Sequence, residues 1–367
     1  MLKVLIVDDT IVYRKIVGDV LKTIPGVEIA GVANNGKIAL SKIKTLKPDV
    51  LTLDIEMPEV SGIEVLEQLN QMESPPVAIM LSTLTRQGSE MTIKALELGA
   101  FDFIPKPDQG SMAENLEKVK QAICPIIETL KKQQLVNRVP ESRQTKTSLR
   151  SVPGPAPALA QPVFKSTRKR NRTIPSEIIG IGISTGGPNA LSEMIPALPA
   201  SLKAPVLIVQ HMPPMFTKSL ANSLNKKSQL EVKEARDGEI IETGKIYIAP
   251  GGRQMKIIAG PDGISRKLKI TDDPPMNSCK PSADYLFMSI AQYYVGRATG
   301  VIMTGMGSDG TEGLKQMKNS GSLIIAQDEP SCTVYGMPKK PVELGLADVI
   351  SPLNKIAHEI TKTVNII

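Results

Sequence analysis

The 367-residue sequence contains little aromatic, histidine or cysteine chemistry. It has no Trp and an aromatic content of 3%, which leaves few rings for stacking on nucleic-acid bases. Its three cysteines, Cys124, Cys279 and Cys332, form no C-x-x-C pair, so neither a disulfide framework nor a zinc site is expected. No apolar run approaches the roughly 20 residues needed to cross a bilayer, and the N-terminus lacks a small-residue cleavage site. We therefore expect a cytoplasmic protein without membrane insertion.

The net charge of +7 is concentrated in one segment. Residues 131–175 contain eleven Lys or Arg and one acid, Glu141, and their charge of +10 leaves −3 for the rest of the chain. Six prolines lie between residues 132 and 175, among Ser, Thr and Gln. This composition is typical of a solvated linker that cannot form a packed core, and we expect no nucleic-acid partner.

Apolar β-like runs alternate with amphipathic helical stretches on both sides of this segment. Five strand-helix pairs fill the first 128 residues, the pattern of a parallel sheet covered by helices on both faces. The alternation resumes at about residue 176. We expect a flavodoxin-like domain at 1–128, a flexible basic linker at 129–175, and a doubly wound, mostly parallel α/β domain at 176–367.

Polar residues follow four of the predicted N-terminal strands. Asp8 and Asp9 follow the first, and Asp54, Ser82 and Lys106 follow the third, fourth and fifth. The carboxyl ends of parallel strands open onto one crevice, so these groups should converge there. Three carboxylates at one edge repel one another unless a hard cation such as Mg²⁺ lies between them. A hydroxyl and a lysine at the same place would stabilise additional negative charge, as on a phosphorylated carboxylate.

The stretches "VDD", "TLDIEMP", "MLST" and "PKP" resemble the receiver domains of two-component response regulators, over residues 1–125. The resemblance implies that Asp54 is the phospho-acceptor. It implies a Mg²⁺ site from three carboxylates and one backbone carbonyl: Asp8, Asp9, Asp54 and Glu56. It also implies switch and phosphate-contacting side chains: Ser82, Lys106 and Phe103. A cis Lys106–Pro107 peptide bond is a further expectation for such a fold.

In the second half, "GISTGG" at residues 182–187 links an apolar run to a helical stretch. Such a turn can hold a serine nucleophile or cradle a phosphate. A phosphate loop would need a lysine beside the hydroxyl residue, and "GISTGGPNALSEM" contains none. Pro188 suits the first turn of a helix, whose free N–H groups can stabilise an oxyanion. The pattern therefore favours Ser184 as a nucleophile.

A serine nucleophile needs a base, and the chain has two histidines. His358 lies in the terminal amphipathic stretch, where a solvated or capping role is expected. His211 ends the apolar run "APVLIVQ", which places it in the same crevice as Ser184. Asp309, in "VIMTGMGSDG", follows another apolar strand and can orient the imidazole. Cys279 is a weaker candidate nucleophile, because the sequence pairs it with no base.

Taken together, "GISTGGP", "VQHMP", "KIYIAPGG", "KPSADYLF", "TGMGSDG" and "AQDEPSCTVYGMP" resemble the chemotaxis protein-glutamate methylesterases, over essentially the full chain. The resemblance implies a triad of Ser184, His211 and Asp309, with oxyanion-hole N–H groups near Thr185 and Met306. One departure is that Cys279-Lys280 stands where the family commonly has His-Arg.

The resemblance implies a phosphorylation-regulated serine hydrolase that demethylates glutamate methyl esters and deamidates glutamines on methyl-accepting chemotaxis receptors. It implies a histidine kinase as phosphodonor and no cofactor for ester hydrolysis. We expect the unphosphorylated receiver to cover the Ser184 crevice. The alternative is a response regulator whose output domain is non-catalytic or binds DNA, although no basic recognition helix is evident in the second half.

Overall fold

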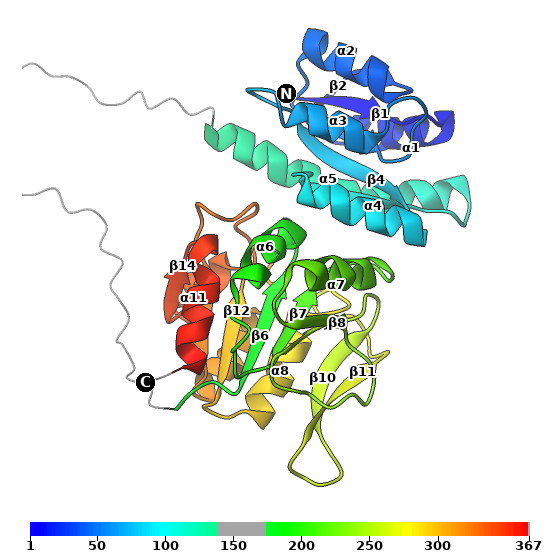
Figure 1. Ribbon diagram of the computed structural model, residues 1–367. Coiled ribbons are helices and arrows are strands. Elements are labelled where there is room, and N and C mark those ends of the chain that lie inside the picture. Colours follow the sequence, from blue (N-terminus) through cyan, green and yellow to red (C-terminus); the bar gives the residue numbers. More distant parts are fainter. Residues whose placement is uncertain (138–173, 366–367) are drawn as a thin grey trace, which may run out of the picture.

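The computed structural model describes residues 1–137 and 174–365, which form two α/β units (Figure 1). The N-terminal unit contains five strands and five helices in alternation: β1 (Leu2–Val7), α1 (Ile11–Lys22), β2 (Val27–Ala33), α2 (Gly36–Leu46), β3 (Val50–Asp54), α3 (Gly62–Leu69), β4 (Val77–Thr83), α4 (Arg86–Glu97), β5 (Asp102–Lys106) and α5 (Met112–Asn137).

The strands of this unit form one parallel sheet in the order β2-β1-β3-β4-β5. All five residues of β3 are buried, as expected for a central strand covered on both faces. Helices α1 and α5 pack on one face, and α2, α3 and α4 cover the other. The five strand-helix pairs predicted from the sequence are confirmed.

The C-terminal unit contains nine strands, six α-helices and one 3₁₀ turn among the described residues: β6 (Ile178–Ile183), α6 (Gly187–Met194), η1 (Ile195–Ala197), β7 (Val206–Gln210), α7 (Phe216–Lys227), β8 (Glu231–Glu234), β9 (Lys245–Ile248), β10 (Gln254–Ala259), β11 (Arg266–Thr271), α8 (Ala283–Tyr293), β12 (Ala298–Ile302), α9 (Thr311–Asn319), β13 (Leu323–Gln327), α10 (Lys339–Glu343), β14 (Val349–Ser351) and α11 (Leu353–Val364).

Seven of these strands form a parallel sheet in the order β14-β13-β12-β6-β7-β9-β8. After β6 the chain adds β7, β8 and β9 on one side of it, and later adds β12, β13 and β14 on the other side. The strand order therefore reverses at β6, and ligands bind at such points in open α/β sheets. The doubly wound parallel fold is confirmed. The antiparallel hairpin β10-β11 is an addition that the strand-helix alternation did not predict.

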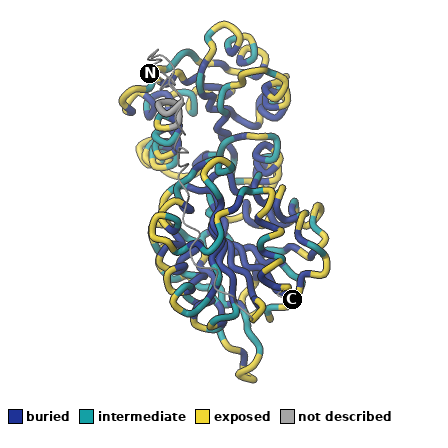
Figure 2. The backbone as a smooth tube through the Cα atoms, turned by 90° about the vertical axis from the view of Figure 1, so that its left-hand side faces the viewer, coloured by how far each residue is buried: buried dark blue, intermediate teal, exposed yellow. Residues whose placement is uncertain are grey.

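The two units pack directly against each other. Helix α4 of the first unit lies against α6 and α7 of the second (Figure 1). Buried apolar residues of α4, including Ile93 and Leu96, belong to the same cluster as Leu191 of α6 and Leu220 of α7. Figure 2 shows buried backbone in both units and exposed backbone mainly around their outer edges. The C-terminal ends of β6 and β7 therefore face the receiver-like unit.

Two expectations need correction. Residues 129–137, expected in the linker, continue helix α5, since Leu, Lys and Gln in this stretch are good helix formers. The rest of the linker to residue 173 lies outside the described residues. Among those that the structure describes, the cis peptide bond joins Lys280 and Pro281, and the Lys106–Pro107 bond is not cis. No helix of the described ranges has the length and apolar character needed to cross a membrane.

Candidate active site and receiver site

The strand ends of the second unit bring together the three residues expected to form a triad. Ser184 directly follows β6, and His211 directly follows the adjacent strand β7. The His211 backbone N–H donates to the carbonyl of Ile183 (3.2 Å), so the hydrogen bonding between β6 and β7 continues up to His211. Asp309 lies in the loop after β12, on the other side of β6. All three therefore lie at the point where the strand order reverses.

The turn that carries Ser184 is held by a buried glutamine. Gln210 Nε2 donates to the carbonyl oxygens of Ser184 (3.0 Å) and His211 (3.3 Å), which couples the two loops. A Cβ on Gly187 would lie 1.9 Å from Gln210 Oε1, so this close approach requires glycine. Gly186 caps helix α6 with φ = 76°, the left-handed region that glycine favours. Sequence reasoning missed Gln210, although it is the one polar residue of the apolar strand "VLIVQ".

The Asp309 carboxylate accepts several hydrogen bonds from residues at the N-terminus of α8. Its Oδ1 accepts from Ser282 Oγ (2.7 Å), and its Oδ2 accepts from the backbone N–H of Ala283 (2.6 Å). Burial alone would raise the pKa of Asp309, but hydrogen bonds from His211, Ser282 and Ala283 outweigh it and lower the pKa to about 2. Asp309 is therefore an anion at neutral pH. Ser282, also missed, is signalled only by its place before the helix as the N-cap.

The two ring nitrogens of His211 have different partners. Nε2 lies 2.8 Å from Asp309 Oδ2, and because Asp309 is ionised, Nε2 carries the donated hydrogen. Nδ1 faces Cys279 Sγ at 3.8 Å. The structure thus pairs Cys279 with a base, contrary to the sequence-based argument, because the loop before α8 folds over the histidine. Among the described residues, Ser184 Oγ and His211 form no direct hydrogen bond, although such contacts are often long in the absence of substrate.

The environment of His211 favours its charged form. The side chain is 16% exposed, and this burial alone would lower its pKa. The hydrogen bonds with Asp309 and Cys279 act in the opposite direction and raise the pKa of His211 to about 9. The second histidine, His358, is exposed on α11, away from these strand ends.

The N-terminal unit brings together an acidic cluster and a lysine. Ligand oxygens of Asp8, Asp9 and Asp54 lie within 4.8 Å of one another. Lys106 Nζ lies 2.7 Å from Asp54 Oδ2 and 2.8 Å from Asp8 Oδ2, and Asp8, Asp54 and Lys106 are buried. Burial is the main cause that raises the pKa of Asp54 to about 6, against the opposing effect of Lys106. An all-oxygen set of this kind fits a hard divalent cation.

The remaining receiver residues do not all face Asp54. The Ser82 hydroxyl accepts from Thr92 Oγ1 of α4 (2.6 Å). The exposed Glu56 donates its backbone N–H to Asp54 Oδ1 (3.4 Å). Phe103 instead packs against the buried Phe216 of the second unit, with ring centroids 4.5 Å apart. The residue expected as an aromatic switch therefore lies in the contact between the units.

Both residues expected near the oxyanion hole contact the receiver-like unit. Thr185 Oγ1 donates to Asp102 Oδ2 of β5 (2.7 Å). Met306 packs against the core of the N-terminal unit, and its Sδ accepts a hydrogen bond from Thr129 Oγ1 of α5 (3.3 Å). Desolvation raises the pKa of Asp102 to about 6, although the hydrogen bond from Thr185 opposes it. Sequence reasoning missed Asp102 and Thr129, which no motif marks.

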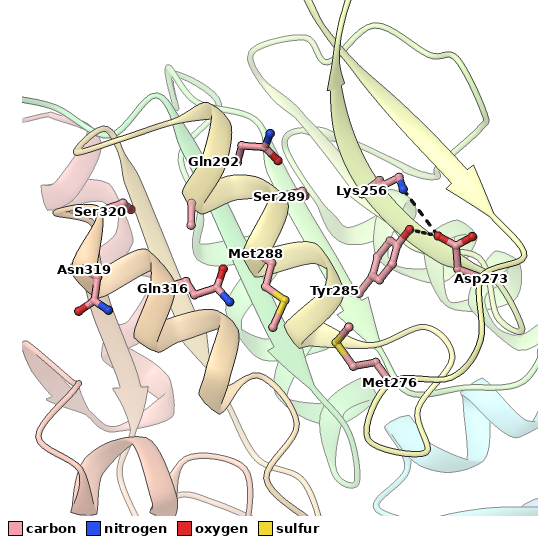
Figure 3. A pocket seen from close by; sticks show the side chains of 11 residues that line it. Lys256, Asp273, Met276, Tyr285, Met288, Ser289, Gln292, Gln316, Asn319 and Ser320 are labelled. Carbon is pink, nitrogen blue, oxygen red and sulfur yellow. Dashed lines mark hydrogen bonds and ion pairs between the residues drawn. The ribbon is translucent and has the colours of Figure 1, made fainter.

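A separate groove lies along α8 and α9 (Figure 3). Its lining includes Tyr285, whose hydroxyl donates to Asp273, and Lys256, which lies 3.6 Å from the same carboxylate. Gln316 and Asn319 lie across the groove from them. None of the candidate triad residues lines this groove.

The comparisons with known proteins define the class first. Residues 4–117 match the family model described as response regulator receiver domain, and residues 179–360 match the one described as CheB methylesterase. The chain is thus a response regulator whose output domain is a methylesterase domain.

The full-length relatives then define the family. The chain is 55% identical to a protein-glutamate methylesterase/protein-glutamine glutaminase of Desulfotalea psychrophila, over 100% of this chain and 99% of that one. A protein of the same name from Bacillus subtilis is 44% identical over 99% of both chains. The crystal structure of the Thermotoga maritima CheB methylesterase catalytic domain covers 52% of this chain and 99% of its own, with 41% identity and a TM-score of 0.50. The chain belongs to the protein-glutamate methylesterase/protein-glutamine glutaminase family.

Proposed function

We propose that this protein hydrolyses glutamate methyl esters, and deamidates glutamines, on chemotaxis receptors under the control of phosphorylation at Asp54. The observation that carries the proposal is the convergence of Ser184, His211 and Asp309 at three neighbouring strand ends, in a chain whose full-length relatives bear this name. The family match favours this function over the DNA-binding or non-catalytic output domain considered above.

The reaction follows from the ring contacts of His211. Asp309 holds Nε2–H, so Nδ1 is the nitrogen that remains to accept the proton of Ser184. Ser184 Oγ attacks the ester carbonyl, and the protonated imidazole then donates its proton to the departing methoxide oxygen, which is released as methanol. Water, deprotonated by the same nitrogen, hydrolyses the acyl-enzyme to glutamate and free Ser184. With a glutamine substrate, the leaving group is ammonia.

The tetrahedral intermediate carries a negative oxygen, for which we assign the backbone N–H groups of Thr185 and Met306. Thr185 follows the nucleophile directly and precedes helix α6, whose N-terminus favours negative charge. Met306 lies in the loop after β12, next to Gly305, where a Cβ would come within 2.7 Å of the Ser184 side chain. Each such donor is worth about 3–4 kcal/mol of transition-state stabilisation.

In the receiver, Asp54 is the proposed phospho-acceptor. Asp8, Asp9 and Asp54, with the Glu56 carbonyl, would hold Mg²⁺, and their oxygen-only chemistry suits that ion. When bound, Mg²⁺ neutralises charge on the phosphoryl group. Lys106 already bridges Asp54 and Asp8, and it is placed to contact a phosphoryl oxygen once Asp54 is modified. Ser82 would complete the switch by exchanging its bond with Thr92 for one with the phosphoryl group.

The contact between the units supports inhibition by the unphosphorylated receiver. Asp102 and Thr129 hold the side chains of Thr185 and Met306, the two residues assigned to the oxyanion hole. The same interface is stabilised by the packing of the Phe103 ring against Phe216 and by a hydrogen bond between Ser89 and Ser219 (2.7 Å). Phosphorylation at Asp54 would loosen this interface and admit the receptor segment. A histidine kinase is the proposed phosphodonor, and the cytoplasm the proposed compartment.

Methanol release from a methylated receptor, with and without a small phosphodonor, tests the proposal directly. The full chain should release methanol faster with the phosphodonor, and Ser184→Ala should abolish turnover. Labelling by a fluorophosphonate separates the two candidate nucleophiles. We expect labelling to be lost in Ser184→Ala and retained in Cys279→Ala, and the reverse result would assign the nucleophile to Cys279.

A further inference from the structure

Cys279 has no role in the serine mechanism, yet the fold positions it beside the base. It lies in the loop between β11 and α8 and exchanges two backbone hydrogen bonds with Met276 (2.9 and 3.1 Å). The buried Gln254 also donates to the Cys279 carbonyl (3.2 Å). Within this loop Asn277 and Ser278 adopt positive φ values of 51° and 61°. These hydrogen bonds fix the backbone from which the Cys279 side chain projects toward His211.

The distance between the two side chains suits a shared metal ion. Cys279 Sγ lies 3.8 Å from His211 Nδ1. Zinc binds thiolate sulfur at about 2.3 Å and imidazole nitrogen at about 2.0–2.1 Å, so a tetrahedral ion holds these atoms roughly 3.6 Å apart. The two atoms already lie near the separation that a single ion requires.

Asp309 contacts the other nitrogen of the His211 ring, the one that faces away from Cys279. It lies 2.8 Å from Nε2, so it fixes the ring orientation and makes the opposite nitrogen a stronger electron donor. Ligand atoms of His211, Cys279 and Asp309 lie within 4.8 Å of one another. A histidine bound by a carboxylate on one nitrogen and free to bind a metal on the other is the usual arrangement at zinc sites.

We propose that Cys279 and His211 form a site for a soft divalent cation of the zinc type, and that its occupancy inhibits the esterase. The ion binds Sγ and Nδ1 in place of their protons, which pass to solvent, and water completes its coordination. Inhibition follows because the ion occupies the lone pair that Ser184 needs. The inhibitory part rests on the proposed role of His211 as base, whereas the binding itself does not.

The N-terminal unit contains a second group of residues that could hold a metal ion, but its ligand atoms differ. Asp8, Asp9 and Asp54 offer oxygen alone, which suits Mg²⁺, whereas thiolate and imidazole select softer ions. A cation at the receiver has no sulfur ligand. An absorption band that arises from sulfur-to-metal charge transfer therefore reports the Cys279 site alone.

The direct test is a titration of the full chain with Co²⁺ in excess Mg²⁺, monitored by near-ultraviolet absorption. We expect a thiolate-to-cobalt charge-transfer band that Zn²⁺ removes. The band should persist in the control Cys332→Ser, which removes another partly buried thiol, and disappear in Cys279→Ser. A band that is absent from the native chain, or unchanged in Cys279→Ser, would overturn the site.

The second arm measures methanol release from methylated receptor at buffered Zn²⁺ concentrations, as a ratio to each variant's own zinc-free rate. Cys279→Ser should require at least about tenfold more Zn²⁺ for half inhibition than the native chain or Cys332→Ser. Equal sensitivity of Cys279→Ser and the native chain would refute inhibition through this site. If the chain showed no esterase turnover, the cobalt band would still decide whether the metal binds.

Discussion

Raising the pH from 7 to 9 should strongly increase the rate of ester hydrolysis by this protein. As the proposed base, His211 can accept the proton of Ser184 only when its imidazole is neutral, and its surroundings raise its pKa to about 9. With that pKa, about 1% of the molecules carry a neutral His211 at pH 7, about 9% at pH 8 and about half at pH 9. The value of kcat/KM should therefore rise roughly ninefold from pH 7 to 8 and roughly fiftyfold from pH 7 to 9.

Methanol release from methylated receptor by the phosphodonor-treated chain measures this profile. Ser184→Ala at each pH gives the spontaneous alkaline hydrolysis to subtract. Cys279→Ala provides the diagnostic variant, because Cys279 is one of the two groups that raise the pKa of His211. Its profile should move to lower pH and its rate at pH 7 should increase. A profile that is flat between pH 7 and 9, or that moves to higher pH in Cys279→Ala, would refute the reasoning.

The raised pKa of His211 also predicts how the stability of the second unit changes with pH. A histidine whose pKa is raised by folding binds its proton more tightly in the native state. His211 therefore stabilises the second unit fully below its ordinary pKa of about 6.5, and this contribution is lost as the pH rises through about 9. Thermal unfolding of His211→Gln should lack this part of the pH dependence, and a variant with the native profile would contradict it.

Three further predictions concern the interface and the serine turn. Asp102→Ala removes the charged acceptor of Thr185, a hydrogen bond worth about 1.5–3 kcal/mol, so methanol release without phosphodonor should rise roughly 10- to 150-fold. An unchanged basal rate would argue against inhibition through this contact. Asp54→Asn should abolish stimulation by a phosphodonor but retain the basal rate, and a surviving response would assign phosphorylation elsewhere. Gly187→Ala should destabilise the second unit by about 1–3 kcal/mol in denaturant unfolding, because its Cβ would clash with Gln210. Gly18→Ala, where the nearest atom is 3.6 Å away, is the matched control and should not destabilise.

Much of the fold could be predicted because its signals are local. Apolar runs such as "VLTLD" and "VLIVQ" end in polar residues, and alternation with amphipathic stretches predicts parallel sheets. The same logic placed Ser184 and His211 at neighbouring strand ends. The pairing of the hairpin β10-β11 was missed because β11 carries charged residues such as Lys267 and Lys269 and forms no continuous apolar run.

What the sequence could not predict depends on contacts between distant segments. Asp102 meets Thr185 across 83 positions of sequence, and neither residue belongs to a periodic pattern that reports the pairing. Cys279 reaches His211 because the loop before α8 turns through two residues of positive φ, Asn277 and Ser278, neither of which is glycine. Asn adopts positive φ more readily than most residues, but Ser does not, so the surrounding structure must hold Ser278 in this conformation.

The hydrogen bonds that Asp102 and Thr129 form with Thr185 and Met306 have a thermodynamic consequence for substrate binding. If the closed interface and an occupied oxyanion hole compete for these two residues, each must weaken the other by the same factor. Phosphorylation would then tighten the binding of any analogue of the tetrahedral intermediate. Reciprocally, such an analogue would favour the phosphorylated state of Asp54 at equilibrium by the same factor. The substrate segment would then act as an allosteric activator of its own demethylation, and the fraction of open molecules would depend on substrate supply as well as on phosphorylation.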